Sequence, residues 1–437
     1  MNLVIAEKPS VAQEFAKALH LNLKRKDGYL ESDEAIVTWC VGHLVTMSYP
    51  EEYDPALEDL TIYHLLTMQA GSKECCNNVW FSKLTRDWET NWLKQPKIRE
   101  DIGKAFHYDS GCSYTLSRIV TKVMGKNCLA LMQERVFDKM GFGEINWLTS
   151  PEGHNTGGWG MYLTAGKISA LAQLLLQKGE WNGEQLIPAW WTEEIGKMRV
   201  VIPEDEKKAL THYAYHIKAG KEIFAAEGAF GQYLICFRDY PVAIGITAGA
   251  SEYLAADICL KYIKEAVQIP CEKENLEEAQ EKLEEKLVHL TLPKPEGDKK
   301  DTNEATKKLL NKRIVFTENP RQIESAVIST VGEELKLELT VAGEKKILFA
   351  GYKDWKCNDM YPNDFTKRYH AVSYAFDEDA LYLSVGLLNT SYREEYCLWV
   401  NSENVVVGTW RPNVTYLPAE EDMTWKFTGT FEPSCIL

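Results

Sequence analysis

Side chains that could carry chemistry are scattered along this chain, and spacing singles out a few of them. In Thr164-Ala-Gly-Lys167 a hydroxyl and an amine stand three residues apart, which on a helix places both on one face. A lysine so placed can accept the proton of the hydroxyl and make the oxygen a nucleophile. No serine in the chain is followed by a lysine three residues later. Because Thr164 also precedes the helical pattern 168–176, we favour a simple N-cap role for it.

Candidate metal ligands are few. His212 and His216 stand four residues apart, but their stretch is strand-like and offers no cysteine or carboxylate to complete a zinc site. We therefore expect no zinc there. Glu7 is different, because it follows the apolar run 2–6, and a carboxylate fixed at a strand end can bind a hard divalent cation. The eleven cysteines include no Cys-x-x-Cys pair, so we expect reduced thiols.

The elements around Glu7 occur in a specific order. Residues 1–10 indicate a strand followed by a polar turn, and residues 11–19 have helical periodicity. Two strand-like runs, 27–31 and 36–45, predict a hairpin or a pair of strands. Together these blocks resemble the start of the TOPRIM domain of bacterial type IA topoisomerases, of the topoisomerase III kind. The resemblance covers about the first 54 residues.

This resemblance implies a magnesium-dependent role for Glu7, which in that family helps to bind a divalent ion and assists proton transfer at the phosphodiester. The family also needs an Asp-x-Asp pair and, further on, a tyrosine nucleophile. The one Asp-x-Asp of the chain, Asp377-Glu-Asp379, lies in a segment that we interpret as a solvated turn. A single glutamate cannot hold a catalytic ion tightly, so we expect Mg²⁺ only if this segment is functional.

From Leu57 onward a second set of blocks appears. In chain order they are Leu60–Met68, Phe106–Ser117, Gly157–Met161 and Leu174–Gly183. Their order resembles the β-lactamase-related serine hydrolases, a group that holds class C β-lactamases, penicillin-binding-protein-like carboxypeptidases and related esterases. The resemblance spans about residues 57–265. It implies an α/β domain of the β-lactamase/transpeptidase type.

In those hydrolases a lysine one helical turn after a serine activates it, and a second element, Tyr-x-Asn or Tyr-x-Ser, supplies a phenol that relays the proton. Tyr108-Asp109-Ser110 matches the second element. The resemblance thus implies Tyr108 as proton relay and Ser110 as a polar group that faces the substrate. Taken without the resemblance, the same residues fit an ordinary turn with a buried tyrosine.

The third element of the family is a strand that lines the site beside the oxyanion position. Its counterpart here is Glu227–Tyr233, which leads into the strand 234–237. We place Gly231 and Gln232 there, on an edge strand, as substrate-binding residues. No lysine or histidine precedes Gly231 at the place where the family has one.

The first element, Ser-x-x-Lys, is missing. The family places it upstream of the Leu60–Met68 block, where this chain has the topoisomerase-like segment instead. Ser113 is the nearest serine to the Tyr108 element, and we expect it to be structural. Natural recombination, an assembly error and a deliberate chimera would all produce such a chain. Because the exchanged portion normally supplies sheet strands and the nucleophile helix, we expect marginal stability.

The sequence predicts a chain of four parts. These are a TOPRIM-like fragment 1–54, a β-lactamase-like domain 55–267, a charged helix and linker 268–311, and an antiparallel β domain 312–437. Amphipathic helices are expected over 254–266 and 272–287. After the linker the apolar period changes to two, as in 335–341, which predicts short paired strands.

Composition limits the partners. The formal net charge of -15 over 437 residues disfavours nonspecific nucleic-acid binding, which depends on cations along a phosphate-facing surface. No apolar run reaches the length of a membrane span and the N-terminus does not fit a signal peptide, so we expect a cytoplasmic protein.

The leading hypothesis is a serine hydrolase that cleaves amide or ester bonds of a small acylated, peptide or ester substrate through an acyl-enzyme. It needs no cofactor, and its activity is expected to be impaired because the nucleophile motif is missing. One alternative is a DNA- and Mg²⁺-binding function from the topoisomerase-like segment. The other is a noncatalytic module that binds acyl ligands without turning them over.

Overall fold

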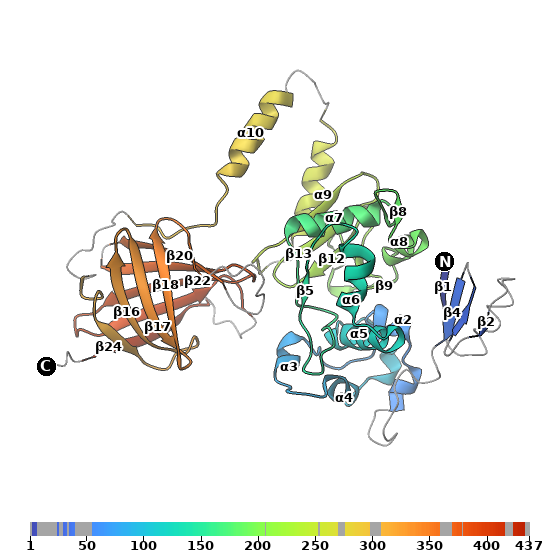
Figure 1. The fold of residues 1–437 in the computed structure, drawn as a ribbon, viewed down its shortest axis with the longest axis horizontal. Coiled ribbons are helices and arrows are strands. Elements are labelled where there is room, and N and C mark those ends of the chain that lie inside the picture. Colours follow the sequence, from blue (N-terminus) through green and yellow to red (C-terminus); the bar gives the residue numbers. More distant parts are fainter. Residues whose placement is uncertain are drawn as a thin grey trace. The chain divides into compact units, whose positions relative to one another are not determined.

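The structure is a computed structural model that describes residues 2–6, 24–25, 29–32, 35–39, 55–205, 207–251, 254–269, 276–297, 307–358, 369–377, 379–415 and 423–432. The chain forms two compact units, whose elements Figure 1 shows. Unit 1 consists of Met1–Met161, Glu194–Glu206 and Thr211–His216, and unit 2 of Tyr162–Glu193, Lys207–Leu210 and Ile217–Leu437.

Unit 1 begins with a small four-stranded sheet. Its strands are β1 (Asn2–Ala6), β2 (Lys24–Arg25), β3 (Tyr29–Glu31) and β4 (Ala35–Trp39), in the order β1-β4-β3-β2. β1 pairs with β4 in parallel, and β3 pairs with β4 in antiparallel fashion. The predicted first strand and the predicted strand pair are therefore confirmed. Glu7 and the predicted helix 11–19 lie outside the described residues.

The rest of unit 1 is mainly helical. The bounds are η2 (Pro55–Asp59), α2 (Ile62–Leu66), α3 (Asn78–Ser82), α4 (Trp88–Leu93), η3 (Arg99–Asp101), α5 (Ser110–Met124), α6 (Cys128–Met132), η4 (Gln133–Phe137), β5 (Asn146–Trp147), β9 (Val200–Val201), η5 (Pro203–Asp205) and β10 (His212–Tyr213). An aromatic-rich core that includes Phe81, Trp92 and Tyr114 packs these elements together. α5 ends at Gly125, whose φ of 65° gives the left-handed cap that glycine adopts without steric cost.

Unit 2 starts with the remaining part of the hydrolase-like region. Two elements, β6 (Met161–Tyr162) and α8 (Ala189–Ile195), have residues in both units. The elements that lie wholly in this part of unit 2 are α7 (Ala165–Leu176), β7 (Glu180–Trp181), β8 (Glu184–Gln185), β11 (Lys218–Ala219), β12 (Ile223–Gly228), β13 (Gln232–Phe237), β14 (Ala243–Ile246) and α9 (Ala255–Ala266). Ala256 of α9 is buried against Ile223 and Ile235 of the sheet. The amphipathic helix predicted over 254–266 is thus confirmed, and it packs on the sheet.

The C-terminal part of unit 2 is a β-barrel. Its strands are β15 (Arg313–Phe316), β16 (Ile323–Val331), β17 (Glu334–Val341), β18 (Glu344–Tyr352), β19 (Lys356–Asn358), β20 (His370–Asp377), β21 (Ala380–Leu387), β22 (Arg393–Val400), β23 (Val406–Pro412) and β24 (Trp425–Phe431). Neighbours pair in the order β18-β17-β16-β15-β24-β23-β22-β21-β20-β19. An extra parallel pairing of β18 with β20 closes the ring.

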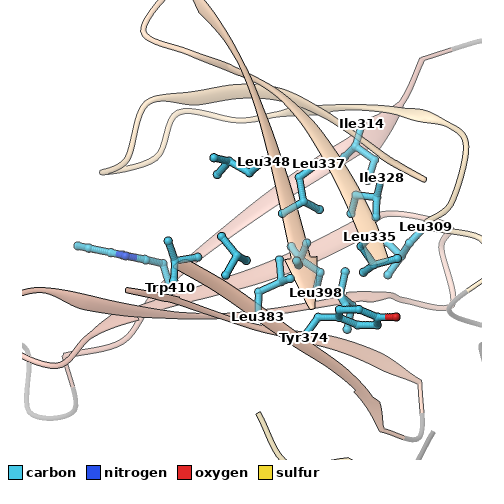
Figure 2. Packing of buried hydrophobic residues seen from close by; sticks show 14 of the residues in the cluster. Leu309, Ile314, Ile328, Leu335, Leu337, Leu348, Tyr374, Leu383, Leu398 and Trp410 are labelled. Carbon is cyan, nitrogen blue, oxygen red and sulfur yellow. The ribbon is translucent and has the colours of Figure 1, made fainter. Parts of the chain in front are cut away.

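The apolar alternation of the strands fills the barrel. Leu335, Leu337, Leu381 and Leu383 all point into one cluster, as the period of two predicts, and Figure 2 shows several of its members together. Trp410 is also buried in this cluster.

Between the hydrolase-like region and the barrel stands α10 (Leu276–Val288). None of its residues is buried, and its apolar stripe, which includes Leu276, Leu283 and Leu287, is exposed. Within the described part of the chain, no helix is long and apolar enough to cross a membrane.

Candidate active site

The Tyr-x-Ser element lies at the start of α5, the longest helix of unit 1. Asp109 is its N-cap and is completely buried. Its carboxylate accepts four hydrogen bonds: from the Gly111 amide at 2.8 Å, the Cys76 amide at 3.2 Å, Trp92 Nε1 at 2.7 Å and the Ser72 hydroxyl. A buried carboxylate with this many donors is well satisfied and difficult to replace. The middle residue of the motif is therefore the anchor of the element.

Gly111 makes this anchor sterically feasible. A Cβ at this position would overlap the indole of Trp92, which must come close to reach the carboxylate of Asp109. The residue directly after the motif must therefore lack a side chain for reasons of packing rather than of backbone flexibility.

The two outer residues of the motif differ in exposure. Tyr108 is 46 % exposed, and its ring meets the ring of Tyr213 edge to face at a centroid distance of 6.5 Å. Ser110 is the first residue of α5 and is only 6 % exposed. Tyr108 is accessible to a ligand in unit 1, whereas the Ser110 side chain faces the protein.

Three blocks of the hydrolase resemblance meet around Ser113, one helical turn further along α5. From the Gly157–Met161 block, a Cβ at Gly157 would lie 2.3 Å from the Ser113 carbonyl oxygen, so glycine is needed there. From the Leu60–Met68 block, the Leu66 carbonyl accepts a hydrogen bond from the His216 amide at 3.1 Å. His216 Nδ1 in turn lies 3.3 Å from Ser113 Oγ.

Sequence spacing did not reveal the Ser113–His216 pair, because the two residues are 103 positions apart. Burial lowers the pKa of His216 to about 4, so the imidazole is neutral at neutral pH. Its φ of 55° is left-handed, and its Nε2 is buried without a hydrogen-bond partner among the described residues. Ser113 is 5 % exposed, and packing against glycine backbone agrees with the structural role expected for it.

Thr164 and Lys167 form no catalytic pair in unit 2. Thr164 is the N-cap of α7, and its Oγ1 accepts a hydrogen bond from the Lys167 amide at 3.3 Å. The capping role predicted for this threonine is confirmed, although the helix begins three residues earlier than the pattern 168–176 indicated.

The third element lies in the β12–β13 hairpin of unit 2. Gly231 is in the turn with a φ of 85°, and Gln232 is the first residue of β13. β13 pairs with β12 on one side and with β14 on the other. The placement of these residues on an edge strand is therefore wrong, because the chain adds β14 after the predicted strand. Their role in substrate binding stays a prediction.

A cation does accompany the third element, but it comes from a neighbouring strand. Lys218 of β11 forms an ion pair with Glu227, and both side chains are largely buried. The hydroxyl of Tyr233 donates to the same carboxylate at 3.0 Å. The sequence did not indicate Lys218, because this lysine lies outside the third element and reaches Glu227 from the neighbouring strand β11.

No metal site is evident in the parts of the chain that the structure describes: no three His, Cys, Asp or Glu side chains are grouped to hold an ion. The cysteines of those parts are all free thiols. Glu7, the one metal ligand predicted from the sequence, lies outside them.

Comparison with known proteins identifies the class of this fold. The family model for Beta-lactamase matches residues 40–266, and this chain belongs to that family. The fold is of the β-lactamase/transpeptidase type with mixed α/β content, followed by a β-barrel domain.

The N-terminal region is similar to a different protein. It is 53% identical over 58 residues to DNA topoisomerase 3 of Staphylococcus aureus strain USA300, and 54% identical over 57 residues to a putative DNA topoisomerase 3 of the bovine strain RF122. These matches cover 13% of this chain, and the chain spans about 8% of the length of those relatives.

Solved structures with related folds include hydrolases and penicillin-binding-protein homologues. A putative 6-aminohexanoate-dimer hydrolase from Bacillus anthracis is 20% identical, covers 52% of this chain and 60% of its own, and has a TM-score of 0.37. The octameric penicillin-binding protein homologue from Pyrococcus abyssi is 11% identical with the same TM-score, over 87% of this chain and 82% of its own. The D-amino acid amidase from Ochrobactrum anthropi is 11% identical, with a TM-score of 0.38 over 48% and 79%.

Proposed function

We propose that this chain is a serine-hydrolase-type protein that recognises small amide or ester compounds and whose acyl-enzyme turnover is impaired. The observation that carries the proposal is the anchoring of the Tyr-x-Ser element at the start of α5, where the buried carboxylate of Asp109 accepts four hydrogen bonds. The missing Ser-x-x-Lys pair supports the impaired chemistry.

In this proposal Tyr108 is the residue that moves the proton. Its exposure leaves the phenol accessible, and the edge contact with Tyr213 orients the ring. Ser110 faces the substrate in the family pattern, and here its burial restricts it to ligands that reach the first turn of α5. Gly231 and Gln232 are proposed to contribute from the hairpin of unit 2.

Turnover and binding can be measured separately. We expect the purified chain to hydrolyse p-nitrophenyl acetate at a rate close to that of a Tyr108→Phe variant, and to bind a β-lactam saturably without consuming it. Efficient hydrolysis that Tyr108→Phe abolishes would contradict impaired turnover. Absence of any saturable binding to folded protein would contradict ligand recognition.

A second function rests on the topoisomerase-like N-terminal region. Its 53% identity to DNA topoisomerase 3 favours Glu7 as a weak Mg²⁺ ligand and a segment that contacts DNA. A salt-dependent affinity for single-stranded DNA that Glu7→Gln weakens only in the presence of Mg²⁺ would support this function. The net charge of -15 opposes it.

A further inference from the structure

The β12–β13 hairpin, which carries the third element, is in contact with the barrel. Gln232 Nε2 donates to the Ser391 hydroxyl at 3.1 Å, although the two residues are 159 positions apart. The same nitrogen donates to the Ala248 carbonyl at 2.6 Å and, at 3.3 Å each, to the carbonyls of Ala229 and Phe230. A side-chain amide has two N–H groups, so these four oxygens occupy it completely. Gln232 thereby ties the hairpin, the loop after β14 and the β21–β22 turn together.

A second set of contacts lies beside the first. Asn413, which follows β23, donates from Nδ2 to the Gly249 carbonyl at 2.9 Å and to the Ser391 carbonyl at 3.0 Å. The Asn413 side chain is fixed by the Arg393 amide, which donates to its Oδ1 at 2.7 Å. A Cβ at Gly249 would overlap both the Ser391 carbonyl and the Asn413 amide. Barrel backbone and loop backbone therefore approach too closely for any residue but glycine.

The tip of the hairpin is strained where the barrel touches it. Phe230 has a φ of 62°, a conformation that is unfavourable for a non-glycine residue and persists only when its surroundings enforce it. Its ring meets the ring of Tyr392 edge to face at 5.7 Å, and its carbonyl accepts from the Ala250 amide at 3.1 Å. One of the enforcing contacts thus comes from the barrel.

We propose that the barrel is a positioning domain for the third element, in which Ser391, Tyr392 and Asn413 hold the hairpin 228–232 in its strained form. Recognition of a small acyl ligand by this hairpin then depends on the barrel contact. Gln232 acts as a positioning residue, since its amide nitrogen is fully engaged. The claim that ligand recognition depends on the barrel rests on the proposed function. The claim that the barrel holds the hairpin 228–232 does not.

Hydrogen exchange of the full chain tests the contact through a glycine pair. Gly249→Ala inserts a methyl group into the contact, while Gly166→Ala is the matched control, because its Cβ would meet only Thr164 Oγ1 at 4.0 Å. We expect the amides of 228–232 and 246–250 to exchange at least tenfold faster in Gly249→Ala than in wild type. Exchange in Gly166→Ala should stay within twofold, and β21 should remain protected in both variants. Unchanged exchange of the hairpin in folded Gly249→Ala would overturn the proposal.

A milder variant keeps the test decisive if Gly249→Ala fails to fold. Ser391→Ala removes only the hydroxyl that Gln232 contacts, and we expect a two- to fivefold faster exchange of 228–232. No change in this variant together with an unfolded Gly249→Ala would overturn the proposal.

Binding of a β-lactam to the same variants separates the two claims. Weaker binding in Gly249→Ala than in Gly166→Ala supports the dependence of recognition on the barrel. Faster exchange with equal binding overturns that dependence and leaves the contact established. Faster exchange with no binding even in wild type leaves the contact established and contradicts the proposed function instead.

Discussion

Two of the family elements, one in each unit, are held in place in different ways. The start of α5 is anchored from within its own motif, because Asp109 stands between Tyr108 and Ser110 and binds donors of the surrounding core. The β12–β13 hairpin is held by residues more than 150 positions away, in the barrel. A motif that contains its own anchor is recognisable from sequence, whereas one that depends on another domain is not.

Loss of the internal anchor should have the largest effect. Asp109→Ala would leave the indole N–H of Trp92, the Ser72 hydroxyl and the Cys76 amide buried without their acceptor. We expect a loss of about 4 kcal/mol in the free energy of unfolding, measured by urea denaturation. Asp239→Ala, an exposed control, should change it by less than about 0.5 kcal/mol. A loss below about 1 kcal/mol in Asp109→Ala would show that the Asp109 carboxylate does not anchor the start of α5.

Acid should weaken unit 1 next. Because burial lowers the pKa of His216 to about 4, the unfolded chain binds more protons than the folded chain between pH 6.5 and 4. Stability from this group is complete above pH 6.5 and is lost as the pH falls towards 4, by on the order of 3 kcal/mol. Denaturation at several pH values should show a shallower acid dependence in His216→Asn. Equal slopes in the two proteins would contradict the burial of the imidazole.

A smaller loss of stability is expected from a substitution at Gly111, against which the indole of Trp92 packs. Gly111→Ala would force Trp92 away from Asp109, and we expect a loss of about 2 kcal/mol from overpacking, measured by thermal or urea unfolding. Gly166→Ala again serves as the control. If the helix simply gains stability from alanine in both variants, the contact between Trp92 and the start of α5 is looser than described.

The smallest effect on stability is expected at Tyr108. The ring is 46 % exposed, so Tyr108→Phe should change the free energy of unfolding by less than about 0.5 kcal/mol. Ligand affinity is the more sensitive readout for this variant, because nearly half of the residue's surface is exposed. A large destabilisation would instead indicate that Tyr108 is a core residue. That result would favour the alternative interpretation, an ordinary turn with a buried tyrosine.

Local patterns predicted much of the fold. The strand pair near the N-terminus, the Thr164 cap, the amphipathic helix at 254–266 and the alternating barrel strands all follow from periods of two or 3.6 and from capping chemistry. Pairing across the sheet did not follow, since β14 turned the expected edge strand into an inner one.

The side-chain pairs that the sequence did not predict depend on how the chain folds back on itself. His216 meets Ser113 across 103 positions, and Lys218 meets Glu227 across the pairing of β11 with β12, so no spacing rule along one element connects either pair. The resemblance identified the Tyr-x-Ser element, but only the structure showed that Asp109 anchors it.

We propose that this chain carries the substrate-side elements of the family without a working nucleophile. Intact-mass spectrometry of the folded chain after incubation with a fluorophosphonate probe, and separately with a β-lactam, tests it most directly. We expect no stoichiometric adduct with either reagent, because no Ser-x-x-Lys pair is present. A single stoichiometric adduct that maps to one serine, such as Ser113, would contradict the claim and establish a nucleophile outside the family motif.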